Sequence, residues 1–229
     1  MNKIEIQNSS QNFYDSFNEF IMSNDNKVFN KLVARSFLMK EVENIPGDIV
    51  ECGVFKGTGI YTFLKLRRLL NANSLKRVIG FDFFDTDDLI NKIQDSVDKS
   101  NMSDLFTQRN FSHNINYKDY LENKLIDHGF HKNEFELVAG DISITSEKYK
   151  KQNPGFKISL LYIDLDIEEP TYNTLKNLYE NVTKGGLIVF DEYAHPAWSE
   201  SKGVDRFLSD MNLEIHNLNY GCPTAYIKK

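Results

Sequence analysis

Two acidic pairs, each directly after a run of apolar residues, are the part of this chain whose chemistry is easiest to interpret. Asp164 and Asp166 follow the apolar run 158–163. Asp191 and Glu192 follow a second run shortly after it. Short runs rich in branched residues predict buried strands, and ligands bind beyond the carboxyl ends of strands in an open parallel sheet. The four carboxylates would converge there and repel, so a hard divalent cation, with Mg²⁺ the first choice, would hold them together.

The same pairs have a purely structural alternative. An aspartate after a strand often caps the helix that follows it and needs no ligand to do so. Two pairs after consecutive predicted strands, together with a glycine-rich loop upstream, favour a functional site. The sequence therefore predicts a cation site at the carboxyl edge of a sheet, with the capping role left open for each pair.

A glycine-rich loop follows the first predicted strand, 48–53, and leads into a predicted helix that begins near Ile60. The pattern from Glu51 is Glu-x-Gly-x-x-x-Gly, which places glycines at Gly53 and Gly57. Glycine lets the backbone approach a ligand closely, and the start of a helix offers unpaired N–H groups. The pattern differs from the Gly-x-Gly-x-x-Gly of dinucleotide-binding proteins, which counts against an NAD-linked enzyme.

Acidic residues end the next two predicted strands as well. Asp82 follows the second strand, where a carboxylate can accept hydrogen bonds from both hydroxyls of a ribose. Asp141 follows the third strand, where an acid can accept a hydrogen bond from an adenine amino group. For each of them the alternative is a solvated loop carboxylate. The order of acids along successive strands favours a nucleoside-type ligand.

These residues need a scaffold that brings the strand ends to one edge. The segment 46–82 has the pattern of strand, loop, helix and strand, which is the right-handed unit of a parallel sheet. Two helices are expected before it, between residues 8 and 45, as either a packing layer or a lid. We expect an α/β, Rossmann-like, doubly wound and mostly parallel seven-stranded sheet, with an antiparallel edge strand and an N-terminal helical layer.

The remaining elements follow from turn signals and hydrophobic periodicity. Helices are expected at 120–129, 168–182 and 199–211, and two final strands at 213–218 and 224–229. The polar segment 83–119 is expected to form a helical insertion beyond the sheet edge, where ligands enter. With no linker or repeat in the sequence, a single domain over 1–229 is expected, with its core in 46–229.

Composition limits the class of protein. The chain has 229 residues, a formal charge of −6 and 41% hydrophobic residues, as expected for one globular domain with a full core. The negative charge argues against nucleic acid as the main partner, and no apolar run is long enough for a membrane span. The first residues lack the apolar stretch of a secretory signal, so a cytoplasmic location is expected. Cys52 and Cys222 lack the spacing of a metal finger.

The order of these motifs resembles that of class I S-adenosylmethionine-dependent methyltransferases. Three segments, 47–57, 162–166 and 185–193, are similar to the macrocin O-methyltransferase family, and the similarity spans about residues 46–207. The resemblance implies a Mg²⁺-dependent O-methyltransferase that uses S-adenosylmethionine. Its acceptor would be a hydroxyl of a sugar, or of a glycosylated or phosphorylated small molecule, in natural-product or surface-glycan biosynthesis.

The resemblance also assigns roles by position. Asp164, Asp191 and Glu192 would be the metal ligands, and Asp166 the general base. The residues expected around the cofactor are Glu51, Gly53, Val54, Phe55, Gly57, Asp82, Asp141 and Asp164. The family usually has a second Asp where this chain has Glu192, so a metal or an acceptor held there would be slightly displaced.

Other interpretations remain open at the level of the sequence. An NAD-linked oxidoreductase or a non-catalytic nucleotide-binding module could share the scaffold, and a catechol-type methyltransferase would use similar metal ligands. His195 is a second candidate for the base. Phe106, Phe111 and Trp198 are either core residues or a platform for a sugar ring. Aromatic residues on the leading helices are compatible with a homo-oligomer.

Overall fold

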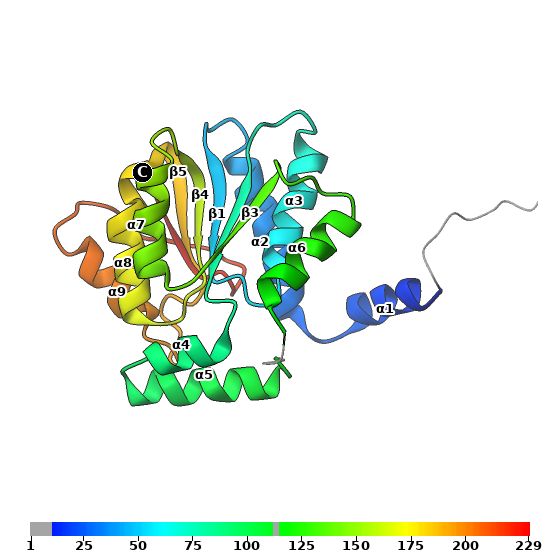
Figure 1. Ribbon diagram of the computed structural model, residues 1–229, viewed down its shortest axis with the longest axis horizontal. Coiled ribbons are helices and arrows are strands. Elements are labelled where there is room, and N and C mark those ends of the chain that lie inside the picture. The colour runs from blue at the N-terminus through cyan, green and yellow to red at the C-terminus, as the bar shows by residue number, and fades with distance from the viewer. Residues whose placement is uncertain (1–10, 112–114) are drawn as a thin grey trace, which may run out of the picture.

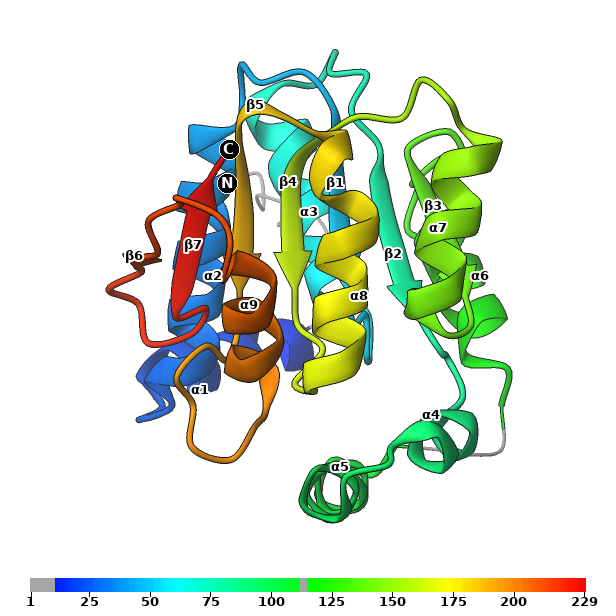
Figure 2. The same ribbon diagram turned by 90° about the vertical axis from the view of Figure 1, so that its left-hand side faces the viewer.

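A computed structural model describes residues 11–111 and 115–229 of the chain, and one seven-stranded sheet lies at its centre. The strand order across the sheet is β3-β2-β1-β4-β5-β7-β6 (Figures 1 and 2). The strands are β1 (Asp48–Cys52), β2 (Val78–Asp82), β3 (Phe135–Ala139), β4 (Ile158–Ile163), β5 (Val182–Phe190), β6 (His216–Asn217) and β7 (Ala225–Lys228). β1 to β5 are parallel, whereas β7 runs antiparallel to β5 and β6. The predicted Rossmann-like α/β fold is therefore confirmed.

Helices cover both faces of the sheet (Figures 1 and 2). Residues of α2, α3 and α6 share one apolar core with the sheet, and residues of α7, α8 and α9 share the other. The helices are α1 (Gln11–Met22), α2 (Asn26–Glu41), α3 (Thr58–Leu70), α4 (Thr86–Lys92), α5 (Ser96–Gln108), α6 (Tyr117–Asp127), α7 (Ile142–Gln152), α8 (Glu168–Leu178), the 3₁₀ turn η1 (Tyr179–Asn181) and α9 (Glu200–Leu208). Within the described part of the chain, no helix has the length and apolar character needed to cross a membrane.

The register of the central strands decides which residues meet at the carboxyl edge. Ile163 at the end of β4 lies beside Cys52 of β1 and Phe190 of β5. The N–H of Asp164 then donates to the Cys52 carbonyl at 2.8 Å, and the N–H of Asp191 donates to the Ile163 carbonyl at 2.9 Å. The two aspartates therefore leave the sheet side by side. The strand order changes direction between β1 and β4, which is where open α/β sheets bind ligands.

The insertion predicted at 83–119 contains α4 and α5, which lie beyond the carboxyl edge of the sheet (Figure 2). Phe55 of the glycine-rich loop stacks on Phe106 and Phe111 of the insertion, with ring centroids 6.1 and 5.1 Å apart. Their apolar cluster also contains Ile167, and it is separate from the two cores on the sheet. The insertion is thus anchored to the ligand edge, and the two aromatic residues are core residues of this cluster rather than an open platform.

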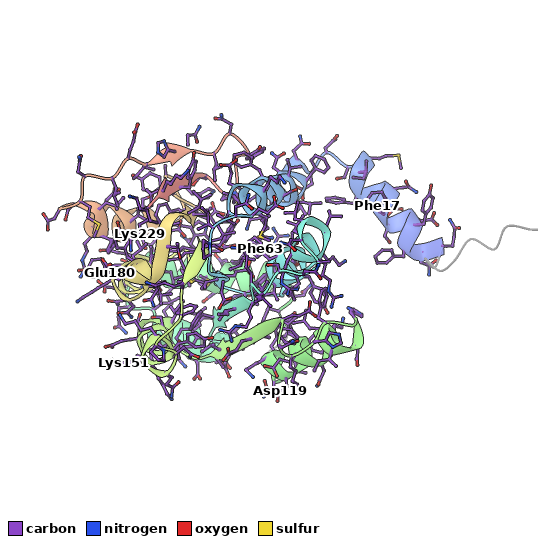
Figure 3. All side chains as sticks on the ribbon, turned by 90° about the horizontal axis from the view of Figure 1, so that it is seen from above. Phe17, Phe63, Asp119, Lys151, Glu180 and Lys229 are labelled. Atoms are coloured by element: carbon purple, nitrogen blue, oxygen red, sulfur yellow. The ribbon has the colours of Figure 1, made fainter. Side chains whose placement is uncertain are left out.

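The two N-terminal helices are held very differently. α2 packs on the body of the protein through Ala34, Leu38 and Met39, and the side chain of Asp25 caps its first turn. No residue of α1 is buried, and this helix projects from the body, as the position of Phe17 in Figure 3 shows. The expected start of the first helix near residue 8 lies outside the described residues. α2 is a packing layer whose first turns approach the ligand edge.

Candidate active site

The four predicted carboxylates meet at the ends of β4 and β5. Asp191 is fully buried and Glu192 is 6% exposed, whereas Asp164 and Asp166 are half-buried. Carboxylate oxygens of Asp191 and Glu192 and the Sγ atom of Cys222 all lie within 4.8 Å of one another. Asp191 and Glu192 therefore form a cluster with a thiol from the connection between β6 and β7, and the Asp164 carboxylate shares the Lys31 ammonium with Asp191.

Asp191 is held by donors on several sides. Tyr162 donates its hydroxyl to Oδ1, and the Sγ of Cys222 lies 3.0 Å from Oδ2. The Nζ of Lys31 lies 2.8 Å from the same Oδ2 and 3.1 Å from Oδ2 of Asp164. Burial alone would raise the pKa of Asp191, but the Lys31 charge and the donors from Cys222 and Tyr162 bring it below its ordinary value. Asp191 is therefore ionised at neutral pH.

Lys31 belongs to a basic stripe on α2 that sequence reasoning missed. Lys27 places its Nζ 3.1 Å from Oε1 of Glu192, and Arg35 places Nη2 3.3 Å from Oε1 of Glu51. The three basic residues are four positions apart, so they share one face of the helix. The repeat of basic residues at i, i+4 and i+8 was the available signal, although the sequence alone does not say what such a stripe faces.

The two carboxyls after β4 have raised pKa values. Burial, together with the nearby charge of Asp191, raises the pKa of Asp164 to about 6 in spite of Lys31. Burial also raises the pKa of Asp166 well above its ordinary value, and the charges of Asp164 and Asp191 add to the effect. A carboxylate with a raised pKa is a stronger base, which suits the predicted role of Asp166 in removing a proton.

The backbone of Asp166 adopts φ +64°, the left-handed conformation that residues other than glycine seldom take. The carbonyl of Asp166 accepts the N–H of Glu200 at 3.0 Å, and the next residue, Ile167, packs in the apolar cluster of the insertion. The surrounding structure thus holds Asp166 in this conformation from two sides. Such strain concentrates where a side chain must be aimed at a ligand.

Glu200 is a second residue of the site that the sequence did not reveal. It is fully buried, and its Oε1 accepts the N–H of Glu192 at 3.0 Å. Its Oε2 has no hydrogen-bond partner among the residues that the structure describes. Burial, followed by the charge of Asp166, raises the pKa of Glu200 well above its ordinary value. Through its N–H and its carboxyl, the first residue of α9 positions both acidic motifs.

The glycine-rich loop approaches the end of β4 very closely. A Cβ on Gly53 would lie 1.8 Å from the carbonyl oxygen of Asp164, and the φ of Gly53 is +91°. Asp82 fixes the loop from the other side, because its Oδ2 accepts the N–H groups of Val54 and Phe55 at 2.7 and 2.9 Å. Burial raises the pKa of Asp82 although these N–H groups oppose the shift. The ribose contact of Asp82 stays a prediction, since the structure gives its carboxylate a first role in holding the loop.

Glu51 lies beneath the loop rather than on its surface. The residue is 1% exposed, and a Cβ on Gly59 would lie 1.6 Å from its Oε1. Burial raises the pKa of Glu51 to about 8, although the Arg35 guanidinium opposes this shift. Gly57, with φ +85°, faces the side chain of Leu121 at a distance that leaves no room for a Cβ. The predicted cofactor contacts of Glu51 and Gly57 stay predictions, and both residues shape the start of α3.

Two further candidates lie near the edge. Asp141 caps α7, with Oδ1 accepting the N–H of Ser143 at 3.0 Å, so its contact with adenine stays a prediction beside a structural role. The Nε2 of His195 lies 3.9 Å from Oε2 of Glu192, at the rim of the acidic cluster. His195 therefore stays the second candidate for the base.

The donor set of the cluster suits a hard divalent cation. Asp164, Asp191 and Glu192 supply carboxylate oxygens, which are the ligands that Mg²⁺ and Ca²⁺ prefer. The concentrated negative charge calls for a cation, and in this structure the ammonium groups of Lys27 and Lys31 meet that need. The residues fit a divalent ion on the condition that Lys31 can move aside.

The sheet order, the reversed last strand and the ligand edge define the chain as a protein of the Rossmann-like methyltransferase class. The solved structure of CalS11, a calicheamicin methyltransferase, is 26% identical, with a TM-score of 0.72 over 96% of this chain and 94% of that chain. The structure of the O-methyltransferase NovP is 20% identical, with a TM-score of 0.69 over 87% of this chain and 79% of that chain, which is a likeness of fold.

The family follows from the sequence comparison. The family model of macrocin O-methyltransferase (TylF) matches residues 33–219, so the chain belongs to the macrocin O-methyltransferase family. A curated relative is the 8-demethyl-8-(2,3-dimethoxy-alpha-L-rhamnosyl)-tetracenomycin-C 4'-O-methyltransferase of Streptomyces olivaceus, 24% identical over 155 residues and 66% of this chain. The match spans 55% of that relative's length. Lys27 and Lys31 lie before the region that the family model matches.

Proposed function

We propose that the chain is an S-adenosylmethionine-dependent O-methyltransferase that methylates a hydroxyl of a sugar, or of a glycosylated or phosphorylated small molecule, with the help of Mg²⁺. The observation that carries the proposal is that Asp164 and Asp191 leave neighbouring strands side by side and share the Lys31 ammonium, with Glu192 next to Asp191 and the glycine-rich loop against Asp164. Membership of the macrocin O-methyltransferase family supports the reaction type.

A sugar acceptor is supported by the names of the relatives. The curated relative acts at a 4' hydroxyl of a tetracenomycin that carries a dimethoxyrhamnosyl group. CalS11 is described as a TDP-rhamnose 3'-O-methyltransferase of calicheamicin biosynthesis, and its apo structure is 26% identical to this chain over 96% of it, with a TM-score of 0.69. We therefore expect a deoxysugar or a related sugar acceptor, and a pathway that builds natural products or surface glycans.

The cofactor would lie over the ends of β1, β2 and β3. The loop around Gly53, Val54 and Phe55 would face its methionine end, Asp82 its ribose and Asp141 its adenine. When bound, S-adenosylmethionine supplies an electrophilic methyl group on sulfur. Phe55 and the insertion close this side of the edge by stacking, which would exclude water from the bound donor.

Asp164, Asp191 and Glu192 would hold the metal. When bound, Mg²⁺ supplies positive charge that lowers the pKa of a hydroxyl beside it. Asp166 would take the proton of that hydroxyl while the oxygen bonds to the methyl carbon and the carbon–sulfur bond breaks, which leaves S-adenosylhomocysteine. Glu200 and the strained backbone of Asp166 keep the carboxylate aimed, and this positioning is a large part of the rate enhancement.

Calorimetric titration with S-adenosylmethionine is the first test, with and without Mg²⁺. Micromolar binding is expected in both conditions, because the proposed cofactor and metal sites use mostly different residues. Turnover would then be measured on a panel of nucleotide-linked sugars, glycosides and catechols, by following S-adenosylhomocysteine formation. Binding of NAD instead of S-adenosylmethionine would overturn the proposal in favour of an oxidoreductase, and turnover of catechols alone would overturn the sugar acceptor.

A homo-oligomer is part of the proposal. α1 exposes several apolar side chains in the described part of the chain: Tyr14, Phe17, Ile21 and Met22. Exposed apolar surfaces of this kind are typical of interfaces, and closed homo-oligomers are the commonest solution. Light scattering on the purified chain should give a multiple of its 26.6 kDa mass, and deletion of residues 1–24 should reduce that multiple. A monomer in the full chain would contradict this part of the proposal.

A further inference from the structure

Lys31 places its ammonium group between two of the proposed metal ligands. Its Nζ contacts Oδ2 of Asp164 at 3.1 Å and Oδ2 of Asp191 at 2.8 Å. These oxygens come from different strands, so no single carboxylate explains the position of the ammonium. An ion bound by both oxygens would need Lys31 to leave, because the same acceptor atoms cannot face two cations at contact distance without strong repulsion.

The position of Lys31 is built into α2. The helix is anchored by Leu38 and Met39 in the core, and Arg35, 5% exposed, ties it to the buried Glu51 beneath the loop. These contacts lie at the C-terminal side of Lys31. The lysine thus extends from a fixed helix toward the cluster rather than from a mobile tail.

The side chain itself can move without any change in the helix. The side chain of Lys31 is 25% exposed, and that of its neighbour Lys27 is 58% exposed. Lysine carries its charge on a flexible four-carbon stem, so the ammonium can turn toward solvent while α2 stays packed. Lys27, paired with Glu192, would release its partner even more easily.

We propose that Lys31 is a tethered cation that holds the acidic cluster together in the metal-free protein and competes directly with the divalent ion for Asp164 and Asp191. This inference rests on the proposed metal role of the cluster. The family match begins at residue 33, so the competing lysine is a feature of this chain that the matched region does not contain. The consequence is a metal affinity that is weaker than the carboxylates alone would give.

Mn²⁺ binding to the full chain tests the proposal without any need for the acceptor. Free Mn²⁺ would be measured by electron paramagnetic resonance with the wild type, Lys31→Met, Lys31→Arg and Lys40→Met. Methionine keeps most of the stem and removes the charge, and arginine keeps the charge. Lys40 lies on the same helix, 64% exposed and paired with Glu43, so it is the matched control.

The expected result is a dissociation constant for Mn²⁺ at least about tenfold lower in Lys31→Met than in the wild type. Lys31→Arg and Lys40→Met should stay within about twofold of the wild type. The melting temperature supplies a second readout. Without metal, Lys31→Met should melt at a lower temperature than the wild type, and added Mn²⁺ should raise the melting temperature of the variant by more than that of the wild type. Adding Asp191→Asn to Lys31→Met should abolish the increase in Mn²⁺ affinity, which would show that the ion binds at the acidic cluster.

Two failures can be told apart. If the wild type binds Mn²⁺ and Lys31→Met binds it no more tightly, the competition is overturned while the metal site stands. If Lys31→Met and the wild type both fail to bind Mn²⁺ at millimolar concentration, the metal role and the competition are overturned together. Titration of the same samples with S-adenosylmethionine reports on the methyltransferase proposal independently and shows whether each variant is folded.

Discussion

The acidic residues in the two halves of the ligand edge are held in place by different kinds of hydrogen-bond donor. In the half formed by β1 and β2, the acid Asp82 is satisfied by backbone N–H groups of the adjacent loop. In the half formed by β4 and β5, the acids Asp164 and Asp191 share the side chain of Lys31, which lies more than a hundred residues away in the sequence, and Asp191 has further donors in Tyr162 and Cys222. The first half is held by backbone N–H groups of the sheet edge, and the second mainly by the positive charge of a side chain from the helical layer.

This difference separates a rigid half from an adjustable one. Backbone N–H groups cannot move without rebuilding the loop, so the proposed cofactor side is preformed. Ammonium groups on flexible stems can be exchanged for another cation, so the proposed metal side can change its state while the sheet stays intact. Changes in the adjustable half should alter catalysis and metal binding, whereas changes in the rigid half should alter stability and cofactor binding together.

The largest effect is expected from Asp166→Asn, which removes the proposed base without changing the size of the side chain. Turnover should fall by about 10³-fold, within the range for loss of a general base, while affinity for S-adenosylmethionine should stay within about twofold. Steady-state kinetics and calorimetry measure the two quantities. Asp210→Asn, the same change at an exposed position, is the control. Full turnover in Asp166→Asn would sink the base assignment and favour His195.

Gly53→Ala tests the rigid half. The added Cβ would lie 1.8 Å from the Asp164 carbonyl at a φ of +91°, so we expect a loss of about 3 kcal/mol in the free energy of unfolding and much weaker S-adenosylmethionine binding. Gly129→Ala is the matched control: its φ is +80°, but no described atom lies within 4 Å of the new Cβ. It should cost about 1 kcal/mol. Urea unfolding of both variants gives the comparison, and equal losses would mean that the close approach at Gly53 contributes nothing.

Asp164→Ala tests the adjustable half. Loss of one proposed ligand should raise the Mg²⁺ concentration needed for half-maximal turnover by about 10- to 100-fold, and the free energy of unfolding should change less than in Gly53→Ala. A metal titration of activity is the measurement. An unchanged titration curve would take Asp164 out of the ligand set, and Asp210→Ala serves as the exposed control.

The smallest effect is expected far from both halves, at the amino edge of the sheet. Hydrogen bonding to Arg68 lowers the pKa of Glu134 to about 2, and Arg67 contributes further charge. Because the folded pKa lies below the ordinary value of 4.5, this stabilisation is complete above pH 4.5 and is lost as the pH falls from 4.5 to about 2.

Glu134→Gln should therefore lower the free energy of unfolding by about 1 kcal/mol at pH 7, and its stability should depend less on pH between 4.5 and 2 than that of the wild type. Urea unfolding across this range measures both quantities. S-adenosylmethionine affinity should not change, since Glu134 lies away from the ligand edge. Parallel pH curves for the two proteins would contradict the assignment.

Much of the sheet follows from the local pattern of residues. Runs such as 158–163 and 135–139 are short, apolar and bounded by turn signals, and they are strands. The exact residues at which helices and strands begin and end are harder to predict from the sequence. β5 begins at Val182, four residues before the apolar run that starts at Gly186, and α9 ends at Leu208, three residues before its expected end. α7 had no counterpart among the expected elements, since its polar sequence carries a weak apolar stripe.

The sequence by itself determined that acids lie at or near the ends of β1 to β5 in order, because a strand end is marked by a local change from apolar to polar residues. It also determined the family, through motifs that are contiguous in the chain. Only the tertiary structure decided that Lys31 meets Asp164 and Asp191, that Glu200 lies buried beneath Glu192, and that Asp82 first serves the loop. Such contacts join distant segments, and they depend on how the strands pair and on how α2 and α9 pack on the sheet rather than on any spacing that the chain displays.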